Sequence, residues 1–192
     1  MADKVDVEAN RAARKWTRGE LAGRVAWGLA TPLFRLSPRL FWGWRRAMLR
    51  AFGAQIGRDV HIYPSVRIAV PWNIRVGDQA AIGDRAILYS LGVITIGARA
   101  TVSQGAHLCA GSHDLTRPDR PLTKPPVRIG EDAWIAADAF IGPSVAVGAR
   151  AVVGARSVVV KDVAVGLIVA GNPARIIRAV ADPGRTEQVE KE

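Results

Sequence analysis

An aliphatic side chain recurs at every sixth position of this sequence, and that period constrains the fold more than any other feature. A period of six fits neither an α-helix, with about 3.6 residues per turn, nor the alternation of an ordinary strand. It fits a short strand followed by a tight corner, and three such units close one triangular coil. We therefore predict a prism of stacked coils with parallel strands and an aliphatic interior. The 15 repeat positions are all Ile, Leu or Val: Ile56, Ile62, Ile68, Val76, Ile82, Leu88, Ile96, Val102, Leu108, Ile129, Ile135, Ile141, Val147, Val153 and Val159.

The fourth position after each aliphatic residue is also restricted. It is small or Val in every unit except the one that contains Trp72, and a Gly often follows the aliphatic residue directly. We expect the small residue to let the chain turn the corner without a clash. A run of β-hairpins would instead alternate with period two and contain Asn-Gly or Asp-Gly turns, so hairpins are disfavoured.

Two insertions interrupt the repeat at Ile74-Arg75 and Ile94-Thr95, 20 residues apart. This spacing predicts that both fall at the same corner of successive coils. One coil later the same corner falls just after His113, where we expect the chain to leave the prism in a proline-rich loop over residues 114–126. Long loops on a regular scaffold often carry function, and His113 stands at the start of this one.

Several segments together resemble the hexapeptide-repeat acyltransferases, a family with a left-handed parallel β-helix. The resemblance covers residues 30 to 180. Within the family, three further segments are most similar to colanic-acid and other exopolysaccharide O-acetyltransferases: 43–46 (GWRR), 63–65 (YPS) and 105–108 (GAHL). The segments that carry the family resemblance are the catalytic-histidine segment 108–114 (LCAGSHD), the acyl-CoA segments 131–135 (EDAWI) and 154–162 (GARSVVVKD), and the closing motif 170–175 (AGNPAR).

This resemblance implies an O-acetyltransferase that moves an acetyl group from acetyl-CoA to a hydroxyl of a saccharide, such as an exopolysaccharide or a lipid-linked precursor. Acetyl-CoA would be a co-substrate, and no metal is expected. It also implies a homotrimer with donor grooves between neighbouring prisms.

Acyl transfer from a thioester to a hydroxyl needs a base, a donor to the developing oxyanion and a positioned thioester. Histidine is a natural base because its ordinary pKa is about 6.5. The resemblance gives this role to His113, in direct attack on the thioester. It also places the backbone N–H of Ala137 near the donor's carbonyl and Trp134 beside the thioester arm.

Coenzyme A carries phosphate groups that need cations. We also expect a short C-terminal helix over residues 172–181, with Asn172 as its cap and Pro173 in its first turn, so that two Arg share one helix face. The resemblance assigns three phosphate contacts and two residues that line the pantetheine groove: Lys161, Arg175 and Arg178 for the phosphates, Ala155 and Val160 for the groove.

The acceptor side departs from the family pattern. Sugar acetyltransferases of this fold place an Asn on the preceding coil, but the matching stretch, residues 88–91, reads LYSL. Acceptor contacts therefore come from elsewhere, with Ser90, Asn73 and Asp114 as candidates. The identity of the acceptor, including a nitrogen in place of a hydroxyl, stays open.

Other functions remain as alternatives. The γ-class carbonic anhydrases share the left-handed β-helix and bind zinc with three histidines, and this chain has three: His61, His107 and His113. The last two are six apart and so lie on successive faces, which does not match a zinc site. An acyl-enzyme on Cys109 is disfavoured too. A further alternative is a non-catalytic β-helix scaffold that binds membrane or nucleic acid.

The N-terminal segment is strongly basic. Residues 1–50 contain 11 Lys and Arg against 4 Asp and Glu, a net charge of +7 out of +10 for the chain. We expect residues 1–15 to be charged and flexible. Residues 16–53 should form two helices, the first ended by Thr31-Pro32, the second capped by Ser37-Pro38 and stopped by Gly53.

The helical segment has two functional interpretations. Apolar and basic residues at helical spacing over residues 16–52 predict peripheral binding to a membrane surface. The same helices could instead cap the open end of the prism, and both readings stay open. Nucleic acid is disfavoured as a partner because no recognised nucleic-acid module is present.

The remaining composition fits a single β-helix domain over residues 54–171. The longest uncharged apolar run near the N-terminus, residues 25–34, is too short to span a bilayer as a helix. Acidic residues precede it and no cleavage site follows, so a secretory signal is not expected. We expect a cytoplasmic protein, on the inner membrane face if the N-terminal helices bind lipid, with residues 182–192 as a polar tail.

Overall fold

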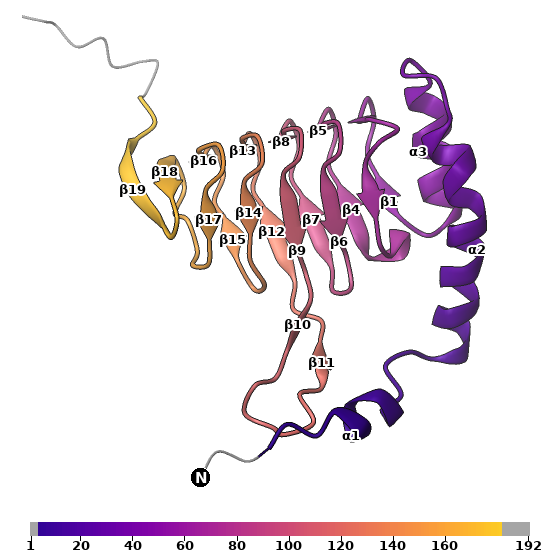
Figure 1. Ribbon diagram of the computed structural model, residues 1–192. Helices are drawn as coiled ribbons and strands as arrows, with labels where there is room; N and C mark the ends of the chain where they lie inside the picture. Colours follow the sequence, from indigo (N-terminus) through magenta and orange to yellow (C-terminus); the bar gives the residue numbers. More distant parts are fainter. Residues whose placement is uncertain (1–3, 182–192) are drawn as a thin grey trace, which may run out of the picture.

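The computed structural model describes residues 4–181, and most of them form a left-handed parallel β-helix with three flat faces (Figure 1). Face A consists of β1 (Gln55–Ile56), β4 (Ile74–Val76), β7 (Ile94–Ile96), β12 (Val127–Ile129) and β15 (Ala146–Val147). Face B consists of β2 (His61–Ile62), β5 (Ala81–Ile82), β8 (Thr101–Val102), β13 (Trp134–Ile135), β16 (Val152–Val153), β18 (Leu167–Gly171) and β19 (Ala174–Ala179). Face C consists of β3 (Arg67–Ile68), β6 (Ile87–Tyr89), β9 (His107–Cys109), β14 (Phe140–Ile141) and β17 (Val158–Val159).

The interior of the prism is filled by the six-residue repeat. All 15 aliphatic residues of the repeat are buried. Equivalent positions pair in register between coils, as Ile62 does with Ile82 and Ile82 with Val102. Each interior side chain therefore packs on its equivalent in the next coil, which confirms the predicted stacking.

The corners turn at a residue in the left-handed backbone region, immediately before the small residue of the repeat. Gln79 has a φ of 60° and precedes the buried Ala80, and Arg99 has a φ of 57° and precedes the buried Ala100. The Gly residues that follow the interior aliphatic residues are needed for a different reason, which is the close approach of the next coil. A Cβ on Gly77 would lie 2.5 Å from the backbone nitrogen of Ala98 in the next coil, so only Gly fits there.

The two insertions lie at one corner, as predicted, because Ile74 pairs with Ile94 across β4 and β7. The excursion, however, begins earlier than expected. The chain leaves the prism after β9 and forms an antiparallel hairpin of β10 (Ser112–His113) and β11 (Leu122–Thr123) before it returns at β12. His113 therefore lies within the hairpin and not at the wall of the prism.

Two helices close the N-terminal end of the prism. They are α2 (Arg18–Arg35) and α3 (Trp42–Ala51), and they bury Trp27 and Phe34 from α2 with Leu49 from α3 in the same core as the first coil. The indole Nε1 of Trp27 donates to the carbonyl of Ile68, at 2.8 Å. The capping interpretation is therefore confirmed. Among the described helices, none has both the length and the apolar content needed to cross a bilayer.

Arg45 fixes α3 to the first coil. Its side chain is fully buried and donates to backbone carbonyls of Ile62, Pro38 and Arg39 and to the hydroxyl of Ser37. Burial lowers the pKa of this guanidinium from its ordinary value. With all three guanidinium nitrogens hydrogen-bonded, a buried charge is tolerated here without a carboxylate partner.

The predicted helix boundaries need three corrections. The first helix does not end at Thr31-Pro32: α2 continues to Arg35, and the Thr31 hydroxyl donates to the carbonyl of Trp27 at 2.8 Å. Ser37 does not cap the second helix, because its hydroxyl donates to the carbonyl of Phe34, at the end of α2. The third correction concerns residues 1–15, where a short helix, α1 (Val7–Ala12), forms. Gly53, with a φ of 85°, does stop α3 as predicted.

The C-terminal helix predicted over residues 172–181 is wrong. Residues 174–179 form β19, which pairs antiparallel with β18 and continues face B. Asn172 lies in the turn between these two strands and caps no helix. The open edge of β18 offers a row of backbone hydrogen-bonding groups, and the chain satisfies them by folding back as a strand. The tail predicted over residues 182–192 lies outside the described residues.

Candidate active site

The hairpin orients the imidazole of His113. Its Nδ1 lies 2.7 Å from the backbone carbonyl oxygen of Arg120. A carbonyl oxygen only accepts hydrogen bonds, so Nδ1 carries the hydrogen and Nε2 of the neutral ring keeps a free lone pair. The side chain is exposed. This arrangement is the one a general base needs, with one nitrogen held and the other open.

A hollow of about 320 Å³ opens beside His113, and the N-terminal segment forms one of its walls. The backbone N–H of Asp6 donates to the carbonyl of Pro118 at 2.9 Å. The Asn10 amide nitrogen donates to the carbonyls of Asp119, at 2.6 Å, and Arg120, at 2.8 Å. The hollow is lined by Val5, Val7, Asn10, His113, Leu115, Asp119 and Arg120.

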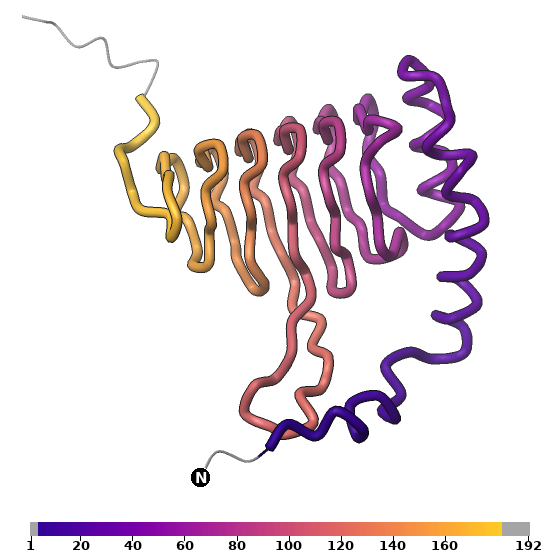
Figure 2. The backbone as a smooth tube through the Cα atoms, in the orientation of Figure 1, coloured from indigo at the N-terminus to yellow at the C-terminus, as the bar shows by residue number. Residues whose placement is uncertain are grey.

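No feature of the sequence predicts this contact. More than a hundred residues separate Asn10 from Arg120, and a charged N-terminus without a repeat suggests flexibility. Figure 2 shows the start of the chain lying across the far end of the hairpin. A second contact stabilises the same junction: the ammonium of Lys124 lies 3.7 Å from the centre of the Trp16 ring and 3.6 Å from a carboxylate oxygen of Glu20.

The three predicted acceptor contacts have different surroundings. Asp114 follows His113, and its Oδ1 accepts from the hydroxyl of Thr116 at 2.6 Å and from its backbone N–H at 2.9 Å. Those two hydrogen bonds hold the pKa of the Asp114 carboxyl below its ordinary value. The carboxylate is therefore ionised beside His113, with its other oxygen open.

Ser90 and Asn73 are used inside the prism. Ser90 is fully buried, and its hydroxyl bonds to both the N–H and the carbonyl of Val70, each at 2.9 Å. The amide nitrogen of Asn73 donates to the carbonyls of Ser90 and Leu91. These side chains close the corner before β4 and β7. The expectation that Ser90 contacts the acceptor is therefore wrong, and the donor half of Asn73 is not available to a ligand.

A groove of about 640 Å³ at the C-terminal end of the prism gathers three of the predicted donor contacts, Val160, Lys161 and Arg175. One wall follows β17 and the other belongs to β19. Arg178, further along β19, is exposed and outside the lining. The register in which β18 pairs with β19 shifts between Ile168 and Val169. The side chains along β19 therefore do not alternate strictly between the two sides of the sheet.

Trp134, Ala137 and Ala155 form a separate group on face B and at the corner between faces B and C. The Trp134 side chain is 49% exposed, and its Nε1 donates to the hydroxyl of Ser103 at 2.9 Å. The Ala137 carbonyl accepts from the N–H of Arg156, the neighbour of Ala155, in the next coil. The Ala137 N–H makes no hydrogen bond within the described part of the chain, so it is open to a ligand.

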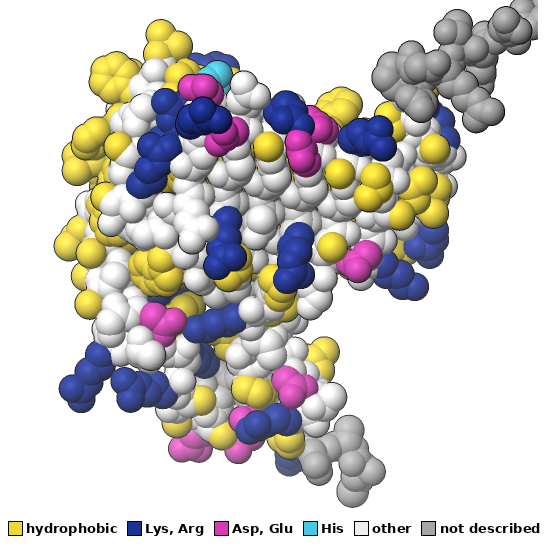
Figure 3. Space-filling view, turned by 180° about the vertical axis from the view of Figure 1, so that it is seen from behind, with side chains coloured by type: hydrophobic (Ala, Val, Ile, Leu, Met, Phe, Trp, Pro, Cys, Tyr) yellow, Lys and Arg dark blue, Asp and Glu magenta, His cyan; other side chains and the backbone are white. Residues whose placement is uncertain are grey.

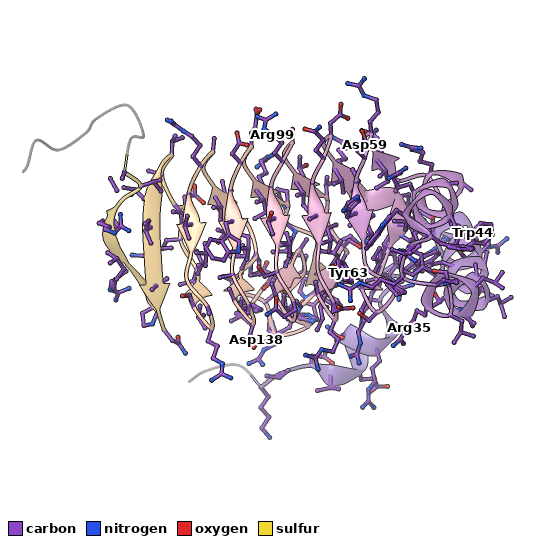
Figure 4. All side chains as sticks on the ribbon, turned by 90° about the horizontal axis from the view of Figure 1, so that it is seen from above. Arg35, Trp44, Asp59, Tyr63, Arg99 and Asp138 are labelled. Atoms are coloured by element: carbon purple, nitrogen blue, oxygen red, sulfur yellow. The ribbon has the colours of Figure 1, made fainter. Side chains whose placement is uncertain are left out.

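One protomer does not bring all these residues together. The β10–β11 hairpin leaves the edge between faces C and A, whereas Trp134 lies on face B, across the prism from that edge (Figure 1). Figure 4, seen from above, shows Arg99 and Asp138 at the two edges that bound face B. The predicted residues thus form three clusters: the hairpin, face B with its corner, and the C-terminal groove.

The remaining histidines lie apart from these clusters. His61 stacks on Trp42, with ring centres 4.6 Å apart. His107 lies between Tyr89 and Phe140 on the outside of face C, and burial lowers its pKa. No group of three His, Cys, Asp or Glu able to hold a metal ion occurs among residues 4–181. Cys109 is half-buried, with its thiol 3.4 Å from the carbonyl of Gly111.

The coiled repeat, the outward imidazole and the cation-lined groove together define an acyltransferase of the β-helix class. A model of the bacterial transferase hexapeptide (six repeats) matches residues 126–161. WcaF of Escherichia coli (strain K12), a predicted colanic acid biosynthesis acetyltransferase, is 45% identical over 152 residues, which covers 79% of this chain and 84% of WcaF. The chain belongs to the hexapeptide-repeat acetyltransferase family.

Other relatives agree on the fold. The galactoside O-acetyltransferase of E. coli (strain K12) is 26% identical over 141 residues, 72% of this chain and 70% of that protein. The hexapeptide-repeat acetyltransferase VCA0836 of Vibrio cholerae O1 biovar eltor, solved in complex with acetyl coenzyme A, superimposes with a TM-score of 0.80 at 28% identity. The match covers 88% of this chain and 93% of that one.

Proposed function

We propose that this protein transfers an acetyl group from acetyl-CoA to a hydroxyl of a saccharide, in the synthesis of an exopolysaccharide or of a lipid-linked glycan precursor. The observation that carries this proposal is the free Nε2 of His113 beside an open hollow, with Nδ1 held by the Arg120 carbonyl. The relatives that are named acetyltransferases of galactoside and of colanic acid biosynthesis support a saccharide acceptor.

The transfer proceeds by direct attack. Nε2 of His113 takes the proton from the acceptor hydroxyl as its oxygen bonds to the thioester carbonyl carbon. The backbone N–H of Ala137 donates to the oxyanion that develops on the thioester oxygen. When the tetrahedral intermediate collapses, the carbon–sulfur bond breaks, and the thiolate of CoA takes the proton back from His113. The products are the O-acetyl ester and free CoA.

The phosphates of CoA are bound by the cations around the C-terminal groove. Lys161 and Arg175 line it, and Arg178 lies beside it on the same strand. The apolar part of the groove at Val160 suits the pantetheine arm, and charged donors suit the phosphates. In the other cluster, Trp134 would contact the thioester arm and Ala155 would line the pantetheine groove.

We further propose that the active unit is a homotrimer with sites between neighbouring prisms. The cross-prism separation of the hairpin and Trp134 supports this arrangement, because the edge that carries His113 in one copy must meet face B of another copy to bring the two together. Prisms that pack side by side with their axes parallel bring such surfaces into contact around a threefold axis.

The decisive experiment compares two variants in acetyl-CoA turnover on a panel of glycans and lipid-linked saccharides. His113→Ala should lower kcat by roughly two to four orders of magnitude, the usual effect of removing a general base, with acetyl-CoA affinity unchanged. Arg175→Gln should instead raise KM for acetyl-CoA. If His113→Ala turns over normally, His113 is not the base. If instead wild-type protein transfers acetyl to no acceptor of the panel, the non-catalytic scaffold is favoured.

A further inference from the structure

The outer face of α2 carries a row of exposed apolar side chains that the fold does not use. We call this row, with its continuation in the next turn of chain, the apolar stripe. The exposed fraction reaches 78% at Leu29 and 84% at Leu36. The spacing of four along α2 keeps the row on one side of the helix. The apolar stripe consists of Leu21, Val25, Leu29, Leu33, Leu36 and Leu40.

The apolar stripe points away from the prism. The opposite side of α2 buries Trp27 and Phe34 against the first coil, and a Cβ on Gly23 would lie 2.9 Å from the Trp72 ring. Because α2 crosses the end of the prism (Figure 1), the side opposite to this contact faces outward along the prism axis. In Figure 3 hydrophobic side chains gather along that end of the molecule. Stabilising the core therefore does not account for these leucines.

The charges around the apolar stripe have one sign. Residues 21–52 contain six Arg and no Asp or Glu, but Arg45 is buried, and Arg39, Arg46 and Arg50 are hydrogen-bonded to the first coil. Arg18 and Arg35, at the two ends of α2, make no hydrogen bond or ion pair with any described residue. Glu20, the acidic residue of α2, is turned to Thr17 and Lys124. Half-exposed Trp44, in α3, adds an aromatic ring at the same end of the prism (Figure 4).

We propose that the apolar stripe and its arginines form a surface that binds the interface of an anionic lipid bilayer. The leucines would enter the boundary between headgroups and acyl chains while Arg18 and Arg35 contact lipid phosphates. A second copy of this chain is a poorer occupant. Two apolar stripes packed together would bring two sets of arginines, without acids between them, into repulsion. This surface is independent of the acetyl-transfer chemistry and would place the enzyme at the membrane where lipid-linked saccharides are found.

Vesicle flotation tests this proposal with the full chain. Wild-type protein should float with vesicles that contain phosphatidylglycerol and bind less to pure phosphatidylcholine. The double substitution Leu29→Gln and Leu33→Gln should lower the partition coefficient at least about tenfold, because it removes apolar area from the contact. Both sites are exposed, so the melting temperature should stay unchanged. The matched control is Val165→Gln, an exposed apolar residue near the opposite end of the prism, which should bind like wild type.

A second variant separates charge from apolar contact. Arg18→Gln with Arg35→Gln should remove most of the preference for anionic vesicles and leave the weaker binding to neutral ones. Absence of wild-type binding to anionic vesicles, or undiminished binding of the Leu29 and Leu33 variant, overturns the proposal. Light scattering tests whether a second copy of the chain occupies the surface instead. If the Leu29 and Leu33 variant differs from wild type in oligomer mass, and wild type does not bind vesicles, the apolar stripe is a contact between copies and the proposal is wrong.

Discussion

At the scale of single residues, the proposed base, His113, is oriented by a backbone carbonyl that is itself held from a distant part of the chain. The Arg120 carbonyl accepts from Nδ1 of His113 and from the Asn10 amide, and the ammonium of Lys15 donates to the Asn10 oxygen at 2.9 Å. Arg120 has a φ of 41°, an unfavourable conformation for a side chain larger than Gly,. A carbonyl in such a turn needs outside contacts to stay in place, and Asn10 supplies one.

We therefore expect Asn10 to be a positioning residue. Asn10→Ala should lower kcat roughly tenfold, because small displacements of a base are costly to the rate, and should leave KM for acetyl-CoA unchanged. Glu8→Gln, on the exposed side of α1, is the matched control and should keep wild-type kcat. Steady-state kinetics with acetyl-CoA varied at saturating acceptor measure both constants. An Asn10→Ala enzyme with wild-type kcat would show that the hairpin holds His113 without help.

At the scale of elements, the sequence predicts whatever depends on a regular pattern. The coils follow from the six-residue period, because each interior position obeys the same packing rule. The hairpin and α1 obey no period, since they are stabilised by contacts between residues more than a hundred positions apart. β19 differs from the predicted helix because the Asn172-Pro173 turn before it resembles a helix start, whereas the open edge of β18 determines its conformation. Of the proposed site, the motif located His113 and the groove residues, but not the hollow's wall at Val5, Val7 and Asn10.

At the same scale, a histidine on the outer side of face C makes the stability of the fold depend on pH. His107 packs between Tyr89 and Phe140, its Nε2 is buried without a partner among the described residues, and burial lowers its pKa. The folded protein thus binds this proton less readily than the unfolded chain does. Stability contributed by the neutral ring is present above the unfolded pKa of about 6.5 and is lost as pH falls through the lower folded value.

The melting temperature should therefore fall less between pH 7.5 and 5 in His107→Gln than in wild type, with a difference of about 2 °C for a chain of this size. The control is His61→Gln, which removes an exposed imidazole stacked on Trp42 and should keep the wild-type slope. Thermal denaturation followed by circular dichroism at each pH measures the effect. Equal slopes for wild type and His107→Gln would rule out His107 as the source.

At the scale of the whole molecule, three different surfaces lie at different points along the axis of the prism. The helices at one end present the apolar stripe, the hairpin at mid-length carries His113, and the groove at the other end contains the cations that we propose bind CoA. In the proposed trimer with parallel axes, three apolar stripes lie on one end and face the same plane. Three weak contacts to one membrane act together, because the second and third become intramolecular once the first has formed. Membrane binding should therefore be much tighter for the trimer than for one prism.

The composite site makes its own prediction for mixed trimers. His113→Ala and Trp134→Ala each damage all three sites of a homotrimer, but the two residues lie across the prism from each other. If a site takes His113 from one copy and Trp134 from its neighbour, a mixed trimer contains sites in which both are intact. Random assembly of equal amounts should restore roughly a quarter of the wild-type sites, since each of the two copies at a site is of the required type half the time.

Unfolding and refolding the two variants together, followed by acetyl-CoA turnover, measures the recovery, and each variant refolded alone is the control. If the mixture is no more active than the two variants measured separately, His113 and Trp134 do not act from neighbouring copies in one site.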